Sequence, residues 1–247
     1  MLRMNCCILC ALAASLLAAP VMADDDFNDN AIGPEWTAVQ DDASRLWLDE
    51  TNQELQVRAA APTDPATDAI YRSDGSAGFQ LLTGSDFSIS IDYAVSGFSG
   101  VGDIGLVLGI GRDLDGTDSA AVAYSVFTTG LAAVYRDNDV QTIVPISVAP
   151  AAGTLTVSYD AGTDVLTLGD AFNQTPLPNL VQGAWGADRV YVSFGARGSG
   201  LTLTGGQASL DNFTLTGQSV PVPEPASAAL LLMGSAGMLV RRCRRHR

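Results

Sequence analysis

Residues 87–93 read Phe-Ser-Ile-Ser-Ile-Asp-Tyr, with an apolar side chain at every second position. Since successive side chains of a β-strand point to opposite faces, this alternation buries one face and leaves the other in water. The same alternation appears in residues 155–159 and 190–194. Nine further runs of β-formers are expected as strands: 54–59, 79–83, 103–110, 120–128, 131–135, 140–146, 164–168, 201–204 and 207–216.

The segments between these runs are rich in turn-forming residues. Residues 159–164, Tyr-Asp-Ala-Gly-Thr-Asp, join two runs and predict a hairpin. The chain has 23 Asp but only 4 Glu, and Asp favours turns whereas Glu favours helices. No stretch between the two ends shows a helical period, and residues 59–68, with two prolines, are expected as a loop. About a dozen short strands with frequent turns predict an all-β sandwich or barrel.

The N-terminal end has the three parts of a secretory signal peptide. Arg3 supplies a positive charge, residues 6–19 are apolar, and the small side chains of Val21 and Ala23 precede an acidic cluster. We expect a signal helix that is removed by cleavage after Ala23. The alternative is a retained anchor, but the apolar run is short of the ~20 residues that span a bilayer.

The C-terminal end also has three parts. A proline-rich segment, residues 221–225, is followed by an apolar helix expected over residues 226–240. An arginine cluster then stops the segment in the membrane; it comprises Arg241, Arg242, Arg244, Arg245 and Arg247. The predicted organisation is therefore a signal peptide over 1–23, a β-domain over 24–219 and a tail over 220–247.

This tail closely resembles the PEP-CTERM sorting tail of Gram-negative bacteria. The matching residues are Pro223, Glu224 and Pro225, followed by the apolar span and the arginines. The resemblance implies recognition by an exosortase, cleavage near the motif, and a link to extracellular polysaccharide and biofilm matrix. It also implies a membrane-inserted precursor whose product is at the cell surface or outside the cell. The alternative is a permanent C-terminal anchor.

The composition of residues 24–219 excludes several classes of function. This region has 7 arginines and no lysine against 26 acidic residues, a formal net charge of −19, which repels nucleic acid phosphates. All four cysteines and the single histidine lie in the end segments. The region therefore has no disulfides, no Ser-His-Asp or Cys-His catalytic group, and no His or Cys ligands for zinc.

The β-domain also resembles concanavalin A-like jelly rolls, the laminin-G and legume-lectin class. The matching residues are 26–28 with Trp36, Leu55, residues 158–160, and the closing residues 210–213. The resemblance implies an antiparallel jelly-roll β-sandwich whose first and last strands lie side by side, with Phe27 and Phe213 in contact there. Members of this class often bind glycans and often hold calcium.

Residues 113–118, Asp-Leu-Asp-Gly-Thr-Asp, are the strongest local candidate for a metal site. Asp113, Asp115 and Asp118 surround a glycine as in the start of a calcium loop, and calcium prefers six to eight oxygen ligands. No Glu stands where an EF-hand needs its twelfth ligand. The alternative is an acidic hairpin tip between Ile110 and Ala120.

Trp185, between two glycines, is the best candidate for stacking on a sugar ring, although a Trp in a sandwich also serves as core packing. The E-x-D-x-x-E strand motif of jelly-roll glucanases is absent, so paired-carboxylate hydrolysis is disfavoured. We expect four arginines to pair with nearby aspartates; they are Arg72, Arg112, Arg136 and Arg197.

The sequence thus predicts an exported, non-enzymatic surface or matrix protein that binds glycan or calcium. A purely structural matrix component is the first alternative. A carboxylate-based glycan hydrolase or lyase is the second.

Overall fold

The computed structural model describes residues 25–222 except for 60–66, 98–99, 127 and 204–206. The predicted signal helix and C-terminal apolar helix lie outside the described residues, as do Pro223, Glu224, Pro225 and the arginine cluster. Within the described part of the chain, no helix is long and apolar enough to cross a membrane.

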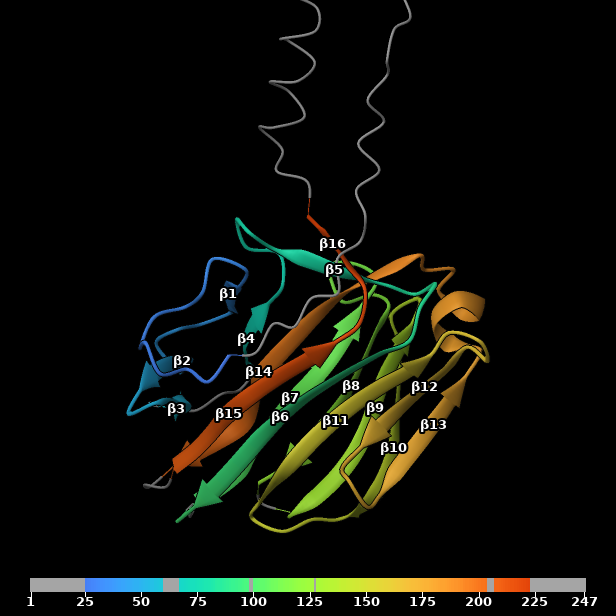
Figure 1. Ribbon diagram of the computed structural model, residues 1–247. Helices are drawn as coiled ribbons and strands as arrows, with labels where there is room; N and C mark the ends of the chain where they lie inside the picture. Colours follow the sequence, from blue (N-terminus) through green and yellow to red (C-terminus); the bar gives the residue numbers. More distant parts are fainter. Residues whose placement is uncertain (1–24, 60–66, 98–99, 127, 204–206, 223–247) are drawn as a thin grey trace, which may run out of the picture.

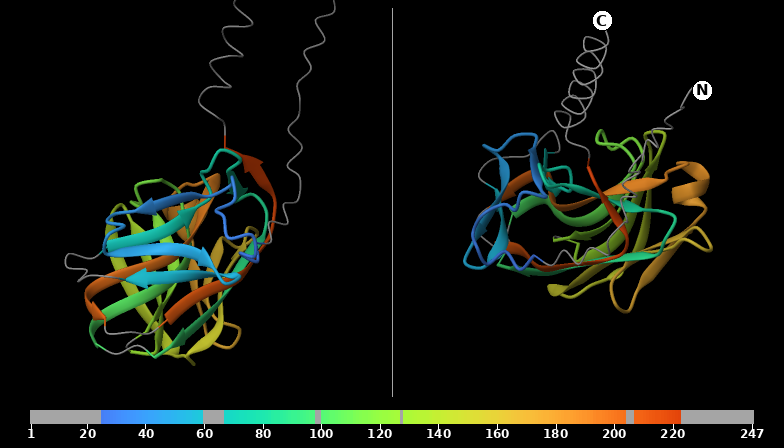
Figure 2. Two further views of the ribbon diagram at one scale, coloured as in Figure 1. Left: turned by 90° about the vertical axis from the view of Figure 1, so that its left-hand side faces the viewer. Right: turned by 45° about the horizontal axis from the view of Figure 1, so that its top comes forward.

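The protein is a sandwich of two antiparallel sheets that lie face to face (Figure 1, Figure 2). The larger sheet has the order β1 (Thr37–Gln40), β4 (Thr67–Arg72), β14 (Arg189–Leu203), β7 (Gly100–Gly111), β8 (Ser119–Ser125), β9 (Gly130–Asp137) and β10 (Val140–Val148). β5 (Phe79–Leu82) pairs with β14 and with β16 (Ser219–Pro221). The smaller sheet has the order β13 (Gln174–Pro178), β12 (Val165–Gly169), β11 (Ala152–Asp160), β6 (Phe87–Ser96), β15 (Gln207–Thr216), β3 (Glu54–Ala59) and β2 (Leu46–Thr51).

The all-β prediction is confirmed, and the differences are local. Five short strands were missed, namely β1, β2, β4, β13 and β16, and two predicted runs join into the long β14. β4 begins at Thr67, inside the expected loop 59–68, and β16 continues past the predicted domain end at residue 219. The one helical element in the described chain is a single π-turn, η1 (Leu180–Ala184). The predicted hairpin at 159–164 is present, since Asp160 pairs with Val165.

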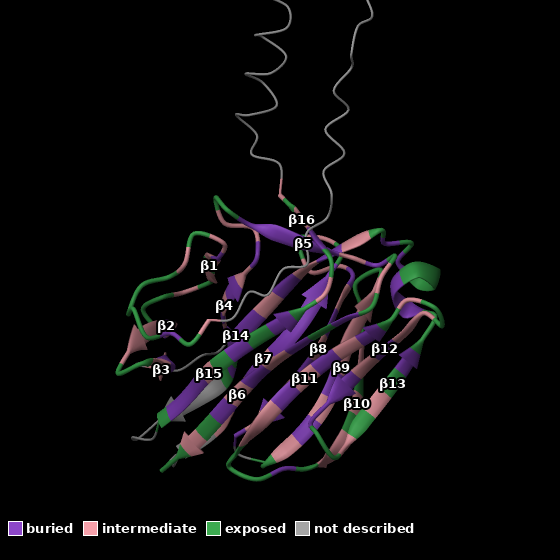
Figure 3. Cartoon of the chain, viewed as in Figure 1, coloured by how far each residue is buried: buried purple, intermediate pink, exposed green. Residues whose placement is uncertain are grey.

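The core fills the space between the sheets with alternate residues of each strand. Ile89 and Ile91 of β6 and Leu106 and Leu108 of β7 are fully buried. The residues between them point away from the core and are partly exposed, which gives the striped burial in Figure 3. This is the period-two pattern that the sequence predicts for half-buried strands.

An aromatic cluster closes the sandwich where the two ends of the domain meet. Asp25 and Phe213 exchange backbone hydrogen bonds of 3.0 and 2.9 Å, so the first segment lies beside the last long strand, as expected. Phe27 and Phe213 both contact the ring of Phe194, with centroids 5.8 and 5.0 Å away. Trp36 packs edge-on against Phe194 at 4.7 Å. Phe194 therefore joins the two end segments.

Candidate functional site

A cleft of about 1100 Å³ lies on the outer face of the larger sheet. Its position follows from the strand alternation, because Leu106, Leu108 and Phe194 fill the core while Val107 and Ser193 face outwards. The cleft crosses all seven strands from β1 to β10. At ~4.8 Å per strand spacing, this corresponds to roughly 29 Å along the sheet, enough for an elongated ligand.

The floor of the cleft is built from small and aliphatic side chains. The strand register sets two neighbouring rows across the sheet. The first row is Ile70, Gly195, Val107, Ala123, Ala132 and Pro145, and the second is Arg72, Ser193, Gly109, Ala121, Val134 and Ile143. The floor is therefore shallow and largely apolar.

Three glycines on the floor differ in whether neighbouring atoms would clash with a side chain at their position. A Cβ on Gly195 would lie 2.3 Å from the Ala69 carbonyl oxygen, and one on Gly109 would lie 2.5 Å from that of Ala120. These two glycines are thus required by backbone packing. A Cβ on Gly105 would meet only the Arg197 carbonyl oxygen, at 3.9 Å, so packing does not require glycine there. Its missing side chain leaves the floor open to a ligand.

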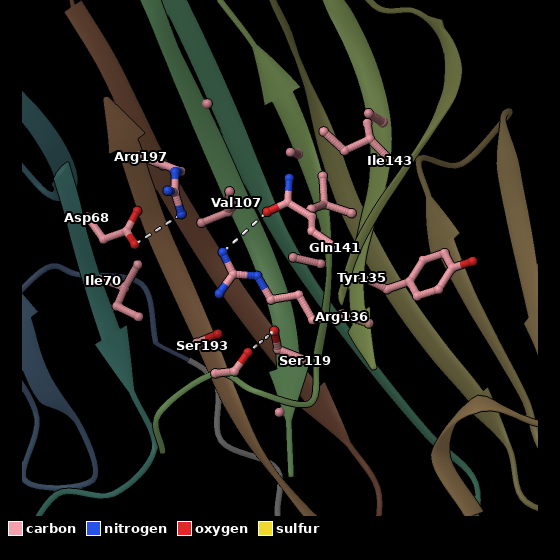
Figure 4. Close-up of a pocket in the computed structure, with 18 of the residues that line it drawn as sticks. Asp68, Ile70, Val107, Ser119, Tyr135, Arg136, Gln141, Ile143, Ser193 and Arg197 are labelled. Atoms are coloured by element: carbon pink, nitrogen blue, oxygen red, sulfur yellow. Dashed lines mark hydrogen bonds and ion pairs between the residues drawn. The ribbon is translucent and has the colours of Figure 1, made fainter. Parts of the chain in front are cut away.

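Aspartates and an arginine form the rim at one end of the cleft. The Arg197 guanidinium lies 3.3 Å from an Asp68 oxygen (Figure 4), and the Asp68 backbone N–H donates to Asp41 Oδ2 at 3.0 Å. Ser125 Oγ donates to Asp103 Oδ2 at 2.7 Å. Burial raises the pKa of the Asp68 carboxyl above its ordinary value. The Arg197 charge lowers this pKa, and the Asp41 charge raises it. Negative charge is thus concentrated at this rim.

The other rim comes from the loops at the opposite strand ends. The two-residue turn between β9 and β10 has positive φ at both Asn138 and Asp139, which places Arg136 opposite Gln141. Arg136 donates to Gln141 Oε1 at 3.2 Å and lies 3.5 Å from Asp139. Figure 4 shows this pair facing the cleft.

Arg72 holds the loop between β7 and β8 against β4. Its guanidinium donates to the Leu114 carbonyl at 2.8 Å and lies 2.7 Å from Asp74. Together with the pairs at Arg112, Arg136 and Arg197, this confirms that the four arginines pair with aspartates. The structure adds that Arg72, Arg136 and Arg197 line one cleft, which their sequence spacing does not show.

The three aspartates predicted as a calcium loop occupy a hairpin tip. Asp113 and Asp118 both lie against Arg112, at 3.0 and 2.9 Å, and Asp118 is buried and accepts the Asn138 backbone N–H. Asp115 accepts the Thr117 N–H at 3.0 Å, and the hydrogen bonds from Thr117 lower its pKa. Among all described residues, no three His, Cys, Asp or Glu side chains are arranged to hold a metal ion. The geometry therefore gives the calcium site no support.

Trp185 is not exposed as a sugar-stacking residue needs to be. Only 2% of it is accessible, its indole N–H donates to the Arg136 carbonyl at 3.0 Å, and its own carbonyl accepts from Arg112. Trp185 directly follows the π-turn η1 and belongs to the buried core, so no ring face is available to a sugar. The prediction for this residue is corrected to core packing.

The sequence carries a signal for the cleft floor in the small residues at alternate positions of three strands. The outward positions of β7, β8 and β9 carry mainly Gly, Ala, Ser and Val, which is unusual for side chains that face water. The rim was harder to find, because Asp68 lies in a strand that was missed and Arg197 is 129 residues away from it.

Comparison with known proteins identifies the tail and the fold. Residues 221–245 match the PEP-CTERM protein-sorting motif. No curated protein matches the chain. Among solved structures, SCLam, a non-specific endo-β-1,3(4)-glucanase from family GH16, shares 9% identity over 81% of this chain and 91% of its own, with a TM-score of 0.57.

Two lectin-type structures show the same architecture. Lectin II from Ulex europaeus shares 13% identity, covering 79% of this chain and 97% of its own, with a TM-score of 0.50. The exoplasmic/lumenal domain of VIP36, in its Ca²⁺/Man3GlcNAc-bound form, shares 13% identity over 79% and 88%, with a TM-score of 0.50. The chain is an exported protein that carries a PEP-CTERM sorting motif and a β-domain with the lectin-like and GH16-like jelly-roll fold.

Proposed function

We propose that the β-sandwich binds glycan chains in the cleft of the larger sheet, outside the cell and without turnover. The observation that carries this proposal is the cleft itself, with a small-residue floor across seven strands and polar rims at both strand ends. A sugar ring has apolar C–H faces and a hydroxyl edge, so an apolar floor between hydrogen-bonding rims complements it. Ligand sites in proteins commonly combine an apolar lining with a few such polar groups.

The chemistry of the lining supports binding rather than catalysis. Hydrolysis of a glycosidic bond ordinarily uses two carboxyl groups on either side of that bond. The described cleft residues include no Glu, His, Cys or Lys. Asp68 is paired with Arg197, and Asp103 accepts a hydrogen bond from Ser125, so both carboxylates are already engaged by the protein's own groups.

One glycine provides a direct test of the binding site. Gly105→Phe in the full-length protein should fill the open space on the cleft floor and abolish glycan binding on an array. The control is Gly84→Phe, because a Cβ on Gly84 would meet no atom within 4 Å and Gly84 lies outside the cleft. Unchanged binding by Gly105→Phe would refute the assignment. Release of reducing ends from a bound glycan would refute the absence of turnover.

A structural role in the matrix is a second candidate, and it rests on strand β10. This edge strand exposes 69% of Val140, 57% of Ile143 and 78% of Val148, which is apolar surface suited to assembly. Pro145 and an adjacent bulge interrupt the same edge, and both features hinder strand-to-strand pairing. Concentration-dependent assembly without glycan binding would favour this second function.

Sorting makes a separate prediction. We expect the exported product to lack residues 1–23 and the region after Pro225, as an exosortase substrate would after cleavage near its motif. Intact mass of the protein from native cell-envelope and secreted fractions measures this directly. A mass that retains the arginine tail would indicate a permanent anchor, and unchanged processing of a P223A/E224A variant would refute exosortase recognition.

A further inference from the structure

We infer that the cleft selects glycans that carry ammonium groups, such as de-N-acetylated hexosamine chains, over glycans that carry carboxylates or sulfates. This inference rests on the proposed function and specifies its ligand. Three observations support it: the balance of charges in the cleft, the pairing of its arginines, and the charge of the whole domain.

The described lining has more negative than positive groups. Five aspartates and three arginines line the cleft. Asp41 and Asp68 lie together at one rim, where the Asp68 backbone N–H donates to the Asp41 carboxylate. Arg197 forms an ion pair with Asp68. An ammonium group placed beside them would be attracted, whereas a carboxylate would be repelled.

The arginines of the cleft already have acceptors. Arg197 pairs with Asp68, Arg136 contacts Asp139 and Gln141, and Arg72 contacts Asp74 and the Leu114 carbonyl. Recognition of a carboxylate or sulfate normally uses a guanidinium fork in a bidentate contact. An anionic glycan would have to displace these acceptors, so the cleft is poorly suited to bind it.

The net negative charge of the whole domain also favours a ligand that carries ammonium groups. Residues 24–219 carry 26 acidic side chains and 7 arginines. Such a surface accelerates the approach of a polycation and slows that of a polyanion, and salt weakens both effects.

The test compares three oligosaccharides of equal length on the full-length protein by calorimetry: glucosamine, N-acetylglucosamine and uronate oligomers. We expect the glucosamine oligomer to bind more than tenfold tighter than the other two and to lose affinity as salt is raised. Equal binding of the N-acetylated oligomer, lost in Gly105→Phe, would refute the ammonium preference and leave the proposed function intact. Absence of binding by all three would refute the ammonium preference, and the glycan array would then decide the proposed function separately.

A charge variant gives the sharpest discrimination. Arg197→Gln removes a cation from the rim and should tighten glucosamine binding by about twofold to fivefold, the scale of a partly exposed charge pair. Asp41→Asn should weaken it. The matched control is Arg189→Gln, which makes the same charge change on β14 but outside the cleft, where Arg189 pairs with Asp188. Weaker binding by Arg197→Gln would overturn the inference, because an ammonium-bearing ligand should gain affinity when a cation is removed from the rim.

Discussion

The inner and outer faces of the larger sheet use the same strands for different purposes. On the inner face, Leu106, Leu108 and Phe194 are fully buried and pack against the smaller sheet. On the outer face of the same strands, Gly105, Val107 and Ser193 line the cleft. Stability therefore depends on one set of alternate positions and ligand access on the other, so the two properties should respond to different substitutions.

The largest effect is expected on the inner face. Phe194→Ala removes the ring that contacts Phe27, Trp36, Tyr71 and Phe213, and a cavity of this kind in a core costs about 3–5 kcal/mol. On the outer face, Val107→Ala should cost about 1 kcal/mol or less, because its side chain is only partly buried. Chemical denaturation of both variants measures the difference. Equal losses would show that the outer face also carries the fold.

This contrast also explains what the sequence could predict. Period-two stretches such as residues 87–93 and 155–159 encode burial directly, so their strands and the sandwich class were predictable. β4 was not, because its residues follow two prolines and its pairing with β14 joins segments more than 120 residues apart. The cleft depends on that pairing, because it brings Asp68 to Arg197.

Trp185 shows a second limit of sequence reasoning. Its flanking glycines are typical of a loop, and the chain does turn there, but the indole side chain is folded inward and hydrogen-bonded to the Arg136 carbonyl. Whether a loop side chain points outward depends on the cavity beneath it. In this protein a carbonyl of β9 accepts the indole N–H, and nothing near residue 185 in the sequence indicates that contact.

Glu50 is a charged residue on the otherwise apolar inner side of the sandwich, and its substitution should have an intermediate effect on stability. Both carboxylate oxygens of Glu50 are buried without a well-formed hydrogen bond, and burial, followed by the charges of Asp25 and Asp29, raises its pKa from 4.5 to about 7. A carboxyl with a raised folded-state pKa binds its proton more tightly in the folded protein. The contribution of Glu50 to stability should thus be most favourable below pH 4.5 and fall as the pH rises towards 7.

Glu50→Gln removes this charge and tests the linkage. At pH 8 the variant should be more stable than the original protein by about 1–2 kcal/mol, after allowance for water reaching a partly exposed side chain. At pH 4 the two should be nearly equal, because Glu50 is then neutral in both folded and unfolded chains. Denaturation at several pH values measures the difference. A constant gap across this range would mean that Glu50 does not titrate as described.

The smallest effect is expected at the hairpin tip between β7 and β8, where Asp113 and Asp118 face Arg112 and Asp115 accepts a hydrogen bond from Thr117. Since these carboxylates are satisfied by the protein's own groups, calcium would have to displace Arg112 to gather them. We expect calcium to leave the melting temperature unchanged in both the original protein and Asp115→Ala. A calcium-dependent rise that Asp115→Ala abolishes would restore the calcium loop and require the hairpin to rearrange around the ion. A rise retained in that variant would place the ion away from Asp115 and would refute the assignment of calcium to this hairpin.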